Sequence, residues 1–331
     1  MITRTVPPWH QSLMDAFRNS HDLAKYLNIE PKQAEFIDGQ EIEFPTLVPR
    51  EFANRMEKEN AKDPLLLQVM PCSKESETTE GYTSDPLGEK AATISPGLLH
   101  KYHGRALLIA TGACPIHCRY CFRRHFPYSE SIAFGPNLDQ AIEYLEGDRD
   151  ISEVILSGGD PLMLNNSTLE TVIHRLEQVD HLQRLRIHSR MPVALPSRID
   201  CGLTSLLKTS RFSPVLVIHC NHPNELDQEV CDRLSDLHIA GVTILNQSVL
   251  LRDINDNAET LSLLSEKLIS CRVLPYYLHL LDQVDGAAHF AVGTSEAVAI
   301  YKQLQKSLPG YLVPRMVHEK AGAKSKLPLL C

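Results

Sequence analysis

From Arg105 onward, short runs of Val, Ile and Leu alternate with amphipathic segments. The apolar runs are Ala106–Thr111, Glu153–Ser157, Arg184–Ser189, Val215–Cys220, Val242–Asn246 and Val273–Leu280, and the amphipathic segments lie near 138–146, 167–179, 200–209, 225–238, 258–270 and 295–307. Short, nearly continuous apolar runs separated by helical patterns predict parallel strands that are covered by helices. The sequence therefore predicts an α/β fold, a partial (β/α)6 barrel, in which the chemistry lies at the C-terminal ends of the strands.

The residues that flank this repeating region follow other patterns. Helical periodicity is short over Trp9–Arg18 and Ser20–Leu27, and a stretch rich in Pro, Thr, Ser and Gly runs from Pro71 to Ser95. We therefore expect a small helical N-terminal region and connector over 1–95, the barrel over 96–308 and a polar tail over 309–331.

The composition argues against several classes of protein. Of the 331 residues, 43% are hydrophobic and 22% are charged, which suits a folded core rather than a disordered or fibrous chain. No apolar run reaches the ~18 residues of a membrane helix, and the N-terminus lacks the pattern of a secretory signal. The formal net charge is −8, so we expect neither nucleic acid nor a membrane as a partner.

The chain has nine cysteines, an odd number, and without a signal sequence this favours a reducing, cytoplasmic compartment. Three of them follow the first predicted strand in Cys114-Pro-Ile-His-Cys118-Arg-Tyr-Cys121. This group could be free thiols, a zinc site completed by His117 or His125, or an iron–sulfur site. We favour a [4Fe–4S] cluster, because three thiolates would bind three irons and leave the fourth open. The other six cysteines (72, 201, 220, 231, 271 and 331) have no ligand spacing and are expected to be small core or surface residues.

The cysteine spacing resembles that of the radical S-adenosylmethionine (SAM) superfamily, in which such a loop follows the first barrel strand. The resemblance implies that Cys114, Cys118 and Cys121 bind a [4Fe–4S] cluster, and that SAM chelates its open iron. Ser157-Gly158-Gly159-Asp160, at the end of the second strand, matches the superfamily segment that binds SAM. Taken alone, this segment would be an ordinary turn in which glycine permits close backbone approach.

Further motifs resemble the lysine 2,3-aminomutase family. They are Lys101-Tyr-His-Gly-Arg105, Ser189-Arg190-Met-Pro-Val193, His222-Pro-Asn-Glu225, Asn246-Gln-Ser-Val-Leu-Leu-Arg-Asp253, Pro275-Tyr-Tyr277 and His289-Phe290. They occur in order between about residues 50 and 328, each at a predicted strand end or in the adjoining loop. The resemblance implies an isomerase that uses pyridoxal phosphate (PLP) as well as the cluster and SAM.

A PLP enzyme of this kind needs a lysine that bonds to the cofactor. The family's lysine precedes a short x-Pro, which matches Lys326 in Ser325-Lys326-Leu327-Pro328. Lys320 and Lys324 are competing positions, because the family's glycine-rich tract is reduced here to Gly322. The resemblance also implies PLP contacts from Lys101, Tyr102, Arg105, Asn246, Gln247 and Ser248, for which buried structural hydrogen bonding is the alternative.

The resemblance assigns three residues to the substrate. Arg123 matches the arginine that pairs with the substrate carboxylate, a contact that suits its planar guanidinium. Asp282 and Glu319 match two acids that pair with the ε-ammonium of lysine, although the family has Asp at the second position. Two carboxylates favour a cationic side chain and would repel an acidic one.

Longer family members continue past the PLP lysine into a zinc-binding extension, whereas this chain stops at Cys331. In this it resembles the branch that supplies (R)-β-lysine for modification of elongation factor P, which implies a ligase of that pathway and a reducing electron donor as partners. Whether lysine is free or carried by a protein, and the oligomeric state, stay open. The alternatives are an aminomutase for another cationic amino acid, a radical SAM enzyme without PLP, and a non-catalytic iron–sulfur or zinc module.

Overall fold

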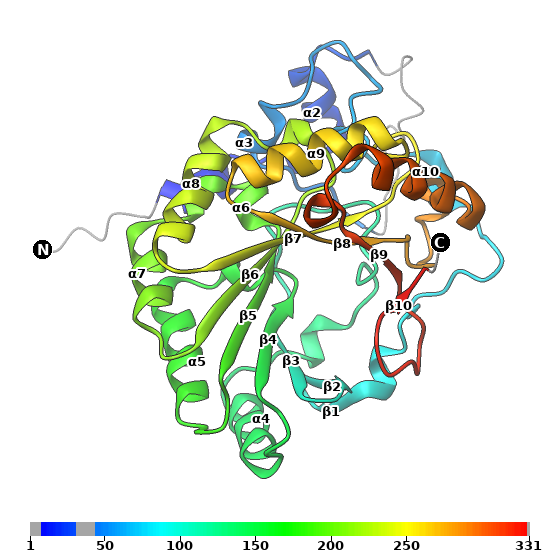
Figure 1. Cartoon of the computed structure of the whole chain (residues 1–331). Helices are drawn as coiled ribbons and strands as arrows, with labels where there is room; N and C mark the ends of the chain where they lie inside the picture. Colours follow the sequence, from blue (N-terminus) through cyan, green and yellow to red (C-terminus); the bar gives the residue numbers. More distant parts are fainter. Residues whose placement is uncertain (1–7, 31–43, 330–331) are drawn as a thin grey trace, which may run out of the picture.

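The computed structural model describes residues 8–30 and 44–329, and its centre is one sheet of ten strands in sequential order (Figure 1). Seven neighbouring strands are parallel: β3 (Arg105–Thr111), β4 (Glu153–Gly158), β5 (Arg184–Ser189), β6 (Ser213–His219), β7 (Thr243–Val249), β8 (Leu274–His279) and β9 (Arg315–His318). Antiparallel strands extend both edges: β1 (Thr93–Ser95) and β2 (Leu98–Tyr102) before β3, and β10 (Leu327–Pro328) beside β9. Within the described residues β1 and β10 each have one neighbour, so the barrel is open.

A helix follows each of the six predicted strands, so all six predicted strand–helix units are present. The helices are α4 (Pro136–Gly147), α5 (Asn166–Glu177), α7 (Cys201–Thr209), α8 (Gln228–Ile239), α9 (Ala258–Ser270) and α10 (Thr294–Ser307), and Figure 1 shows α5, α7 and α8 outside the strands. Several of these helices begin at an Asn or Asp whose side chain accepts a backbone N–H of the first turn, as Asn165 does for α5. The buried residues of α5 are Leu169, Val172, Ile173 and Leu176, the spacing of one apolar stripe facing the sheet.

The N-terminal region shares its core with the barrel. Its helices are α1 (Pro8–Met14), α2 (Ser20–Tyr26) and α3 (Arg50–Ala53), and the short helix α6 (Met191–Ala194) lies beneath α3. Trp9, Leu23 and Phe52 belong to the same buried cluster as the apolar residues of α5 and α8. Short 3-10 turns complete the fold: η2 (Ser73–Ser76), η3 (Glu89–Ala92), η4 (Tyr128–Glu130), η5 (Pro161–Met163), η6 (Pro196–Arg198), η7 (Pro223–Glu225), η8 (Ala288–Phe290) and η9 (Gly310–Leu312).

Four strands were not predicted. The expected connector ends in β1, which pairs with β2, and the expected tail contains β9 and β10, so the tail completes the sheet instead of lying outside it. β9 has four residues and β10 has two, which is too short for a periodic pattern to show. The position of β9 makes seven parallel strands, one more than the six predicted.

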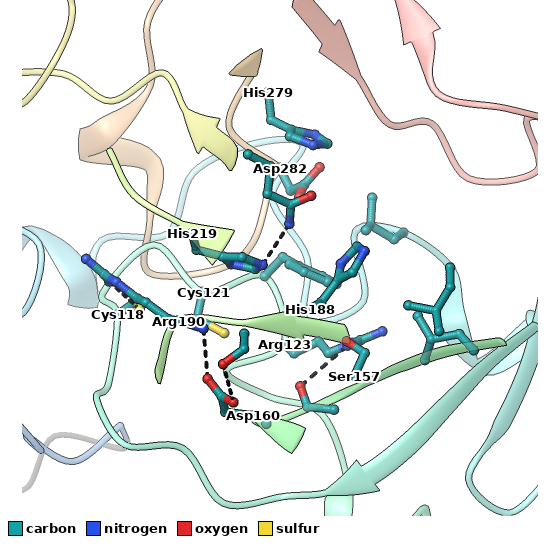
Figure 2. A pocket seen from close by; sticks show the side chains of 18 of the residues that line it. Cys118, Cys121, Arg123, Ser157, Asp160, His188, Arg190, His219, His279 and Asp282 are labelled. Carbon is teal, nitrogen blue, oxygen red and sulfur yellow. Dashed lines mark hydrogen bonds between the residues drawn. The ribbon is translucent and has the colours of Figure 1, made fainter. Parts of the chain in front are cut away.

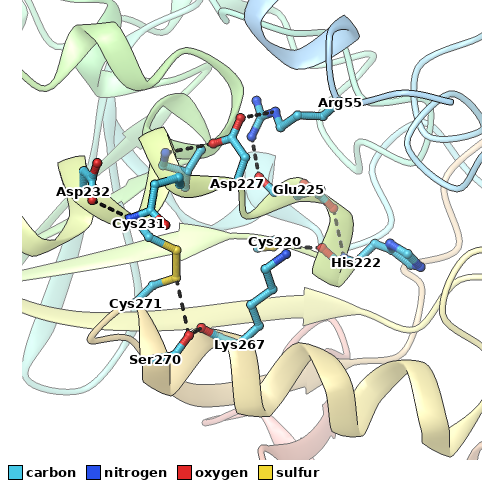
Figure 3. Close-up of a disulfide and its surroundings, with 12 residues drawn as sticks. Arg55, Cys220, His222, Glu225, Asp227, Cys231, Asp232, Lys267, Ser270 and Cys271 are labelled. Atoms are coloured by element: carbon cyan, nitrogen blue, oxygen red, sulfur yellow. Dashed lines mark hydrogen bonds and ion pairs between the residues drawn. A yellow bond between two sulfur atoms is a disulfide. The ribbon is translucent and has the colours of Figure 1, made fainter.

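The cysteines outside the Cys114–Cys121 loop also depart from expectation. Cys231 of α8 and Cys271, which directly follows α9, form a disulfide with their Cα atoms 4.7 Å apart (Figure 3). The sequence analysis expected small core or surface residues here and no disulfide, because the two cysteines are 40 positions apart and no local spacing links them. Among the described helices, none has the length and apolar character to cross a membrane.

Candidate active site

A cavity of about 500 Å³ extends from the C-terminal ends of the strands into the barrel interior (Figure 2). Its lining brings together most of the sequence-predicted site residues: Cys114, Cys118, Cys121, Arg123, Ser157, Gly158, Gly159, Asp160, Lys101, Tyr102, Arg105, Gln247, Asp282, Glu319 and Lys326. These residues come from β2, β3, β4 and β7, from the loops that follow β3, β4 and β8, and from the segment between β9 and β10. One cavity therefore joins the cysteine loop, the Ser157–Asp160 segment and Lys326.

The N-terminal region holds the cysteine loop in place. The backbone N–H of Arg119 donates to Gln68 O at 2.9 Å, and that of His117 donates to Leu47 O at 2.9 Å. Arg119 is fully buried and forms an ion pair with Glu75, which also accepts Arg124 Nη2 at 2.7 Å. Sequence patterns did not reveal this support, because Gln68 and Glu75 lie in irregular segments far from the cysteines.

The three thiols suit a cluster by their chemistry and surroundings. Burial raises the pKa of Cys114 and raises that of Cys121 to about 11. Such thiols ionise readily only beside strong positive charge, which irons supply. Arg190 Nη1 also donates to Cys118 Sγ at 2.6 Å.

The Ser157–Asp160 segment lies directly against the chain that leads into the cysteine loop. The Gly159 N–H donates to Thr111 O at 2.7 Å, and the Asp160 N–H donates to Ala113 O at 2.8 Å. A Cβ on Gly158 would come within 2.4 Å of Thr111 O, and one on Gly159 within 2.4 Å of Ala113 O. This close backbone packing requires glycine at both positions. The packed segment forms part of the cavity wall.

The Asp160 carboxylate is occupied by the protein itself. It accepts Ser189 Oγ at 2.7 Å and the backbone N–H groups of Arg190, Met191 and Leu162 at 2.8 to 3.0 Å. Burial raises the pKa of Asp160 to about 6, and these hydrogen bonds oppose the rise. Asp160 thus fixes the turn after β5, and direct SAM contact through its carboxylate stays a prediction.

At the other end of the cavity, Lys326 forms an ion pair with Glu319. The second oxygen of Glu319 accepts Lys101 Nζ at 3.3 Å and Tyr102 OH at 3.1 Å. Burial lowers the pKa of Lys326 to about 7, with Asp282 opposing the change, and burial raises the pKa of Asp282 to about 6. A lysine with this pKa is partly neutral at pH 7, as a nucleophilic amine must be.

Three histidines that the sequence analysis did not single out also face this end. His188 of β5, His219 of β6 and His279 of β8 line the cavity, and burial lowers the pKa of each, to about 3 for His219. His219 Nε2 contacts Gln247 Nε2 at 2.9 Å, whereas in the described part of the chain His188 Nε2 and His279 Nε2 have no hydrogen-bond partner. Unpartnered buried nitrogens beside Lys326, with Lys101 and Arg105, fit a polar, anionic cofactor such as PLP. For His188, the signal was the period-two placement of Arg184, Arg186 and His188 along β5.

Two of the expected PLP contacts are placed elsewhere. Asn246 and Ser248 are buried on the other face of β7 and do not line the cavity. Asn246 Oδ1 accepts the Cys220 N–H at 2.9 Å, and Ser248 Oγ donates to Cys220 O at 2.7 Å. Successive residues of a strand point to opposite faces, so Gln247 enters the cavity while its neighbours tie β7 to the residue after β6.

Arg123 is buried and already paired. Its Nε and Nη2 donate to the two carboxylate oxygens of Glu89 at 2.7 and 2.6 Å, and Nη1 donates to Ser157 Oγ at 2.9 Å. Glu89 lies in η3, whose preceding Gly88 approaches the tail at Ala321. A substrate carboxylate would have to share this guanidinium with Glu89 or displace it, so the assigned contact stays a prediction.

The sequence was compared with known proteins. Residues 103–187 match a family model described as a 4Fe-4S single cluster domain. The chain is 45% identical to the L-lysine 2,3-aminomutases of Escherichia coli (strain K12) and Haemophilus influenzae, over 97% and 98% of its length and 94% and 96% of theirs. It is 33% identical to the L-lysine 2,3-aminomutase of Clostridium subterminale over 97% of its length and 77% of the relative's.

Among solved structures, a radical SAM methyltransferase from Sphaerobacter thermophilus overlaps with 67% of this chain and 68% of its own, at 14% identity and a TM-score of 0.49. That overlap is too low to define the fold, which rests on the strand order described above. The near full-length identity to several aminomutases does define the family. With its cysteine loop after the first parallel strand and its half-buried lysine in the tail, the chain belongs to the lysine 2,3-aminomutase family of isomerases.

Proposed function

We propose that this protein converts (S)-α-lysine into (R)-β-lysine, moving the amino group from C2 to C3 with the help of a [4Fe–4S] cluster, SAM and PLP. The observation that carries the proposal is the single cavity, which contains the three cysteines at one end and Lys326 with two carboxylates at the other. The identity of 45% to curated L-lysine 2,3-aminomutases supports the same reaction.

When bound, the cluster and SAM supply a carbon radical for hydrogen transfer at C3, and PLP supplies a conjugated ring that stabilises the migrating nitrogen. Cys114, Cys118 and Cys121 would hold the cluster. Lys326 would bond to PLP through Nζ, and His188, His279 and Lys101 would surround the cofactor with donors. The buried walls exclude water and hold the reacting groups in one orientation.

Charge matching supports lysine as the substrate. Asp282 and Glu319 offer two carboxylates to an ε-ammonium, and Arg123 offers a cation to the carboxylate at the opposite end of the amino acid. In the structure Glu319 is paired with Lys326, and Lys326 must leave that contact to bond to PLP. Glu319 then becomes available for the substrate ammonium.

The test is anaerobic incubation of the reconstituted protein with lysine, SAM, PLP and a reductant, followed by chiral amino-acid analysis. We expect (R)-β-lysine, and parallel reactions with arginine and ornithine test whether another cationic amino acid is preferred. Omission of PLP from stripped protein separates this reaction from a radical SAM reaction that needs no PLP. Turnover without PLP, or no β-amino acid from any of the three substrates, would refute the proposal.

We further propose that the product is used by a ligase that modifies elongation factor P. The support is the resemblance to the branch of the family that supplies (R)-β-lysine, together with an identity of 45% to the Escherichia coli and Haemophilus influenzae relatives against 33% to the clostridial one. The intact mass of elongation factor P from a deletion strain tests this. Fully β-lysylated factor in that strain would dismiss the role, whatever the purified protein does with lysine.

A further inference from the structure

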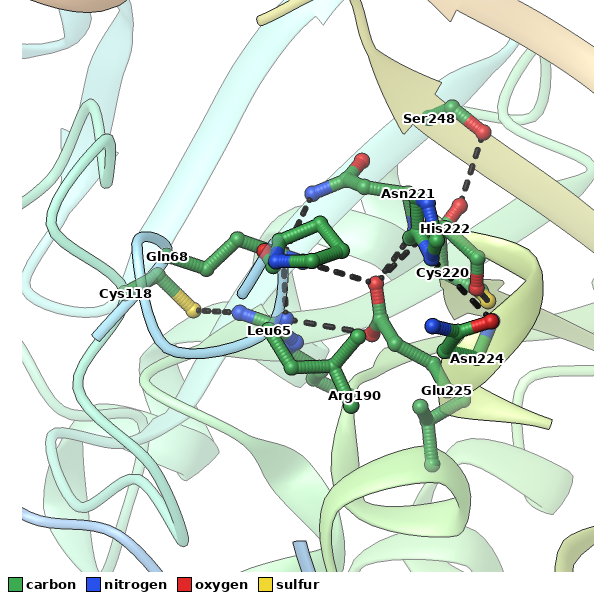
Figure 4. A network of polar contacts seen from close by, with 12 residues as sticks. Leu65, Gln68, Cys118, Arg190, Cys220, Asn221, His222, Asn224, Glu225 and Ser248 are labelled. Atoms are coloured by element: carbon green, nitrogen blue, oxygen red, sulfur yellow. Dashed lines mark hydrogen bonds and ion pairs between the residues drawn. The ribbon is translucent and has the colours of Figure 1, made fainter. Parts of the chain in front are cut away.

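A buried arginine that the proposed reaction leaves unused touches one of the cysteines. Arg190 follows β5, is 5% exposed, and donates from Nη1 to Cys118 Sγ at 2.6 Å (Figure 4). Its Nη2 donates to Gln68 Oε1 at 2.6 Å and to Glu225 Oε2 at 3.1 Å. Nη2 of the guanidinium is thus held by Gln68 and Glu225, and Nη1 is directed at the sulfur of Cys118.

Both ends of the Arg190 side chain are anchored. Its backbone N–H donates to Asp160 Oδ2 at 2.8 Å. Glu225, which is fully buried, receives the guanidinium and also accepts the backbone N–H groups of Asn221 and His222 at 2.9 and 3.0 Å. The guanidinium therefore cannot turn away from Cys118 without breaking a buried ion pair, which is costly.

This placement has an electronic consequence at a cluster ligand. A cationic N–H donor withdraws electron density from a thiolate, and hydrogen bonds and charge near the sulfurs set the potential of an iron–sulfur cluster. One-electron reduction adds a negative charge to the cluster, and a fixed buried cation stabilises that charge more in a protein interior than it would in water.

We propose that Arg190 sets the reduction potential of the cluster by holding its guanidinium against Cys118 Sγ, so that the cluster accepts an electron more easily. The inference rests on the cluster of the proposed function but not on the identity of the substrate. Arg190 is here an electrostatic determinant of electron transfer, whereas Glu225, Gln68 and Asp160 position it.

The experiment is a redox titration of the reconstituted cluster without SAM, followed by electron paramagnetic resonance, in wild type, Arg190→Gln and Arg190→Lys. We expect Arg190→Gln to reduce the equilibrium constant of one-electron reduction at least tenfold, which is about 59 mV in the midpoint. Arg190→Lys keeps the positive charge but lacks the planar guanidinium, so its midpoint potential should lie between those of wild type and Arg190→Gln. Arg55→Gln is the matched control, because the Arg55 side chain is buried and donates to Glu225 O and Val193 O, and none of its hydrogen bonds or ion pairs within the described residues is to Cys114, Cys118 or Cys121.

Omitting SAM separates this role from one in which Arg190 binds SAM, which would leave the midpoint of the bare cluster unchanged. Equal midpoints in wild type and Arg190→Gln at equal iron content would overturn the proposal. If Arg190→Gln does not retain iron, Arg190→Lys decides, and a wild-type midpoint there overturns the proposal. A wild type that binds no cluster would instead count against the proposed function.

Discussion

The two ends of the cavity are held in different ways. Around the cysteine loop, buried charges are matched and fixed: Arg119 with Glu75, and Arg190 with Glu225. Around Lys326, one carboxylate, Glu319, serves three partners, and within the described residues two histidine Nε2 atoms, of His188 and His279, have no hydrogen-bond partner. A cluster that transfers electrons needs constant surroundings, whereas a lysine that bonds to PLP and then yields to a substrate amine must exchange contacts. We call the end around Cys114, Cys118 and Cys121 the prebuilt end and the end around Lys326 the exchanging end.

The largest effect should come from removing a cysteine at the prebuilt end. Cys118→Ala should abolish the cluster absorbance and all turnover, because the remaining two thiolates cannot hold three irons. Iron analysis and visible absorbance check this, with the exposed Cys201→Ala as a control that should match wild type. Normal iron content in Cys118→Ala would remove the basis of the cluster assignment.

The exchanging end is tested by the pH dependence of PLP attachment. Lys326→Ala should remove the bond to PLP, and Lys320→Ala should not. Burial lowers the pKa of Lys326 to about 7. The neutral amine is the nucleophile, so the rate of attachment should rise from pH 6 to 8 and level off above. Stopped-flow absorbance measures this, and a rate still rising steeply at pH 9 would indicate an ordinary lysine.

The support of the cysteine loop can be removed without touching a thiol. Glu75→Gln leaves the buried guanidinium groups of Arg119 and Arg124 without their shared carboxylate. Breaking a buried pair in this way typically costs about 3–5 kcal/mol, so unfolding in urea should begin at much lower concentration and iron retention should fall. Asp236→Asn, which breaks an exposed pair with Arg233, should change the urea midpoint far less. Similar midpoints for the two variants would contradict the description of a prebuilt end.

Asp282→Asn tests the substrate contact at the exchanging end. Losing a charge-assisted contact in a desolvated site typically costs about 2–5 kcal/mol, so kcat/KM for lysine should fall well over tenfold. Cluster and PLP content should stay unchanged, which spectra of the same samples report. Normal turnover of lysine by both Asp282→Asn and Glu319→Gln would show that the ammonium is bound elsewhere.

The smallest effect should separate the two faces of β7. Ser248→Ala removes two buried hydrogen bonds, from Ser248 Oγ to Cys220 O and from Asn246 Nδ2 to Ser248 Oγ, each worth about 1 kcal/mol of stability, and should not change PLP affinity. Gln247→Ala should weaken PLP binding because Gln247 lines the cavity beside His219. Fluorescence titration with PLP compares the PLP affinities of the two variants. A larger loss of PLP affinity in Ser248→Ala than in Gln247→Ala would show that PLP binds on the other face of β7.

Much of the barrel could be predicted because its inner strands carry long apolar runs and its helices have one apolar stripe. The edge strands could not, since β10 and β1 have two and three residues and pair only after the central sheet exists. The error at Asn246 and Ser248 was avoidable in principle. Both share the face of the buried Ile244, which points to the helices, and period-two alternation therefore leaves Gln247 for the cavity.

The supporting charges of the site could not be predicted from local patterns. Glu89 meets Arg123 across 34 residues, and Gln68 meets Arg190 across 122. Each belongs to an irregular segment whose polar residues read as ordinary surface until the fold buries them. The cysteines could be singled out because an iron–sulfur site requires one residue type at a particular spacing, whereas Lys326 was assigned only through the resemblance to the family.

The support of the cysteine loop by Leu47, Gln68 and Glu75 has a consequence for biosynthesis. These residues precede the cysteines, so a growing chain already contains them when Cys121 leaves the ribosome. At typical elongation rates Lys326 follows about 10–40 s later, after every parallel strand of the sheet. Synthesis is thereby ordered: the nascent chain contains the residues that support the cysteine loop before it contains Lys326 and the last strand of the sheet, β10.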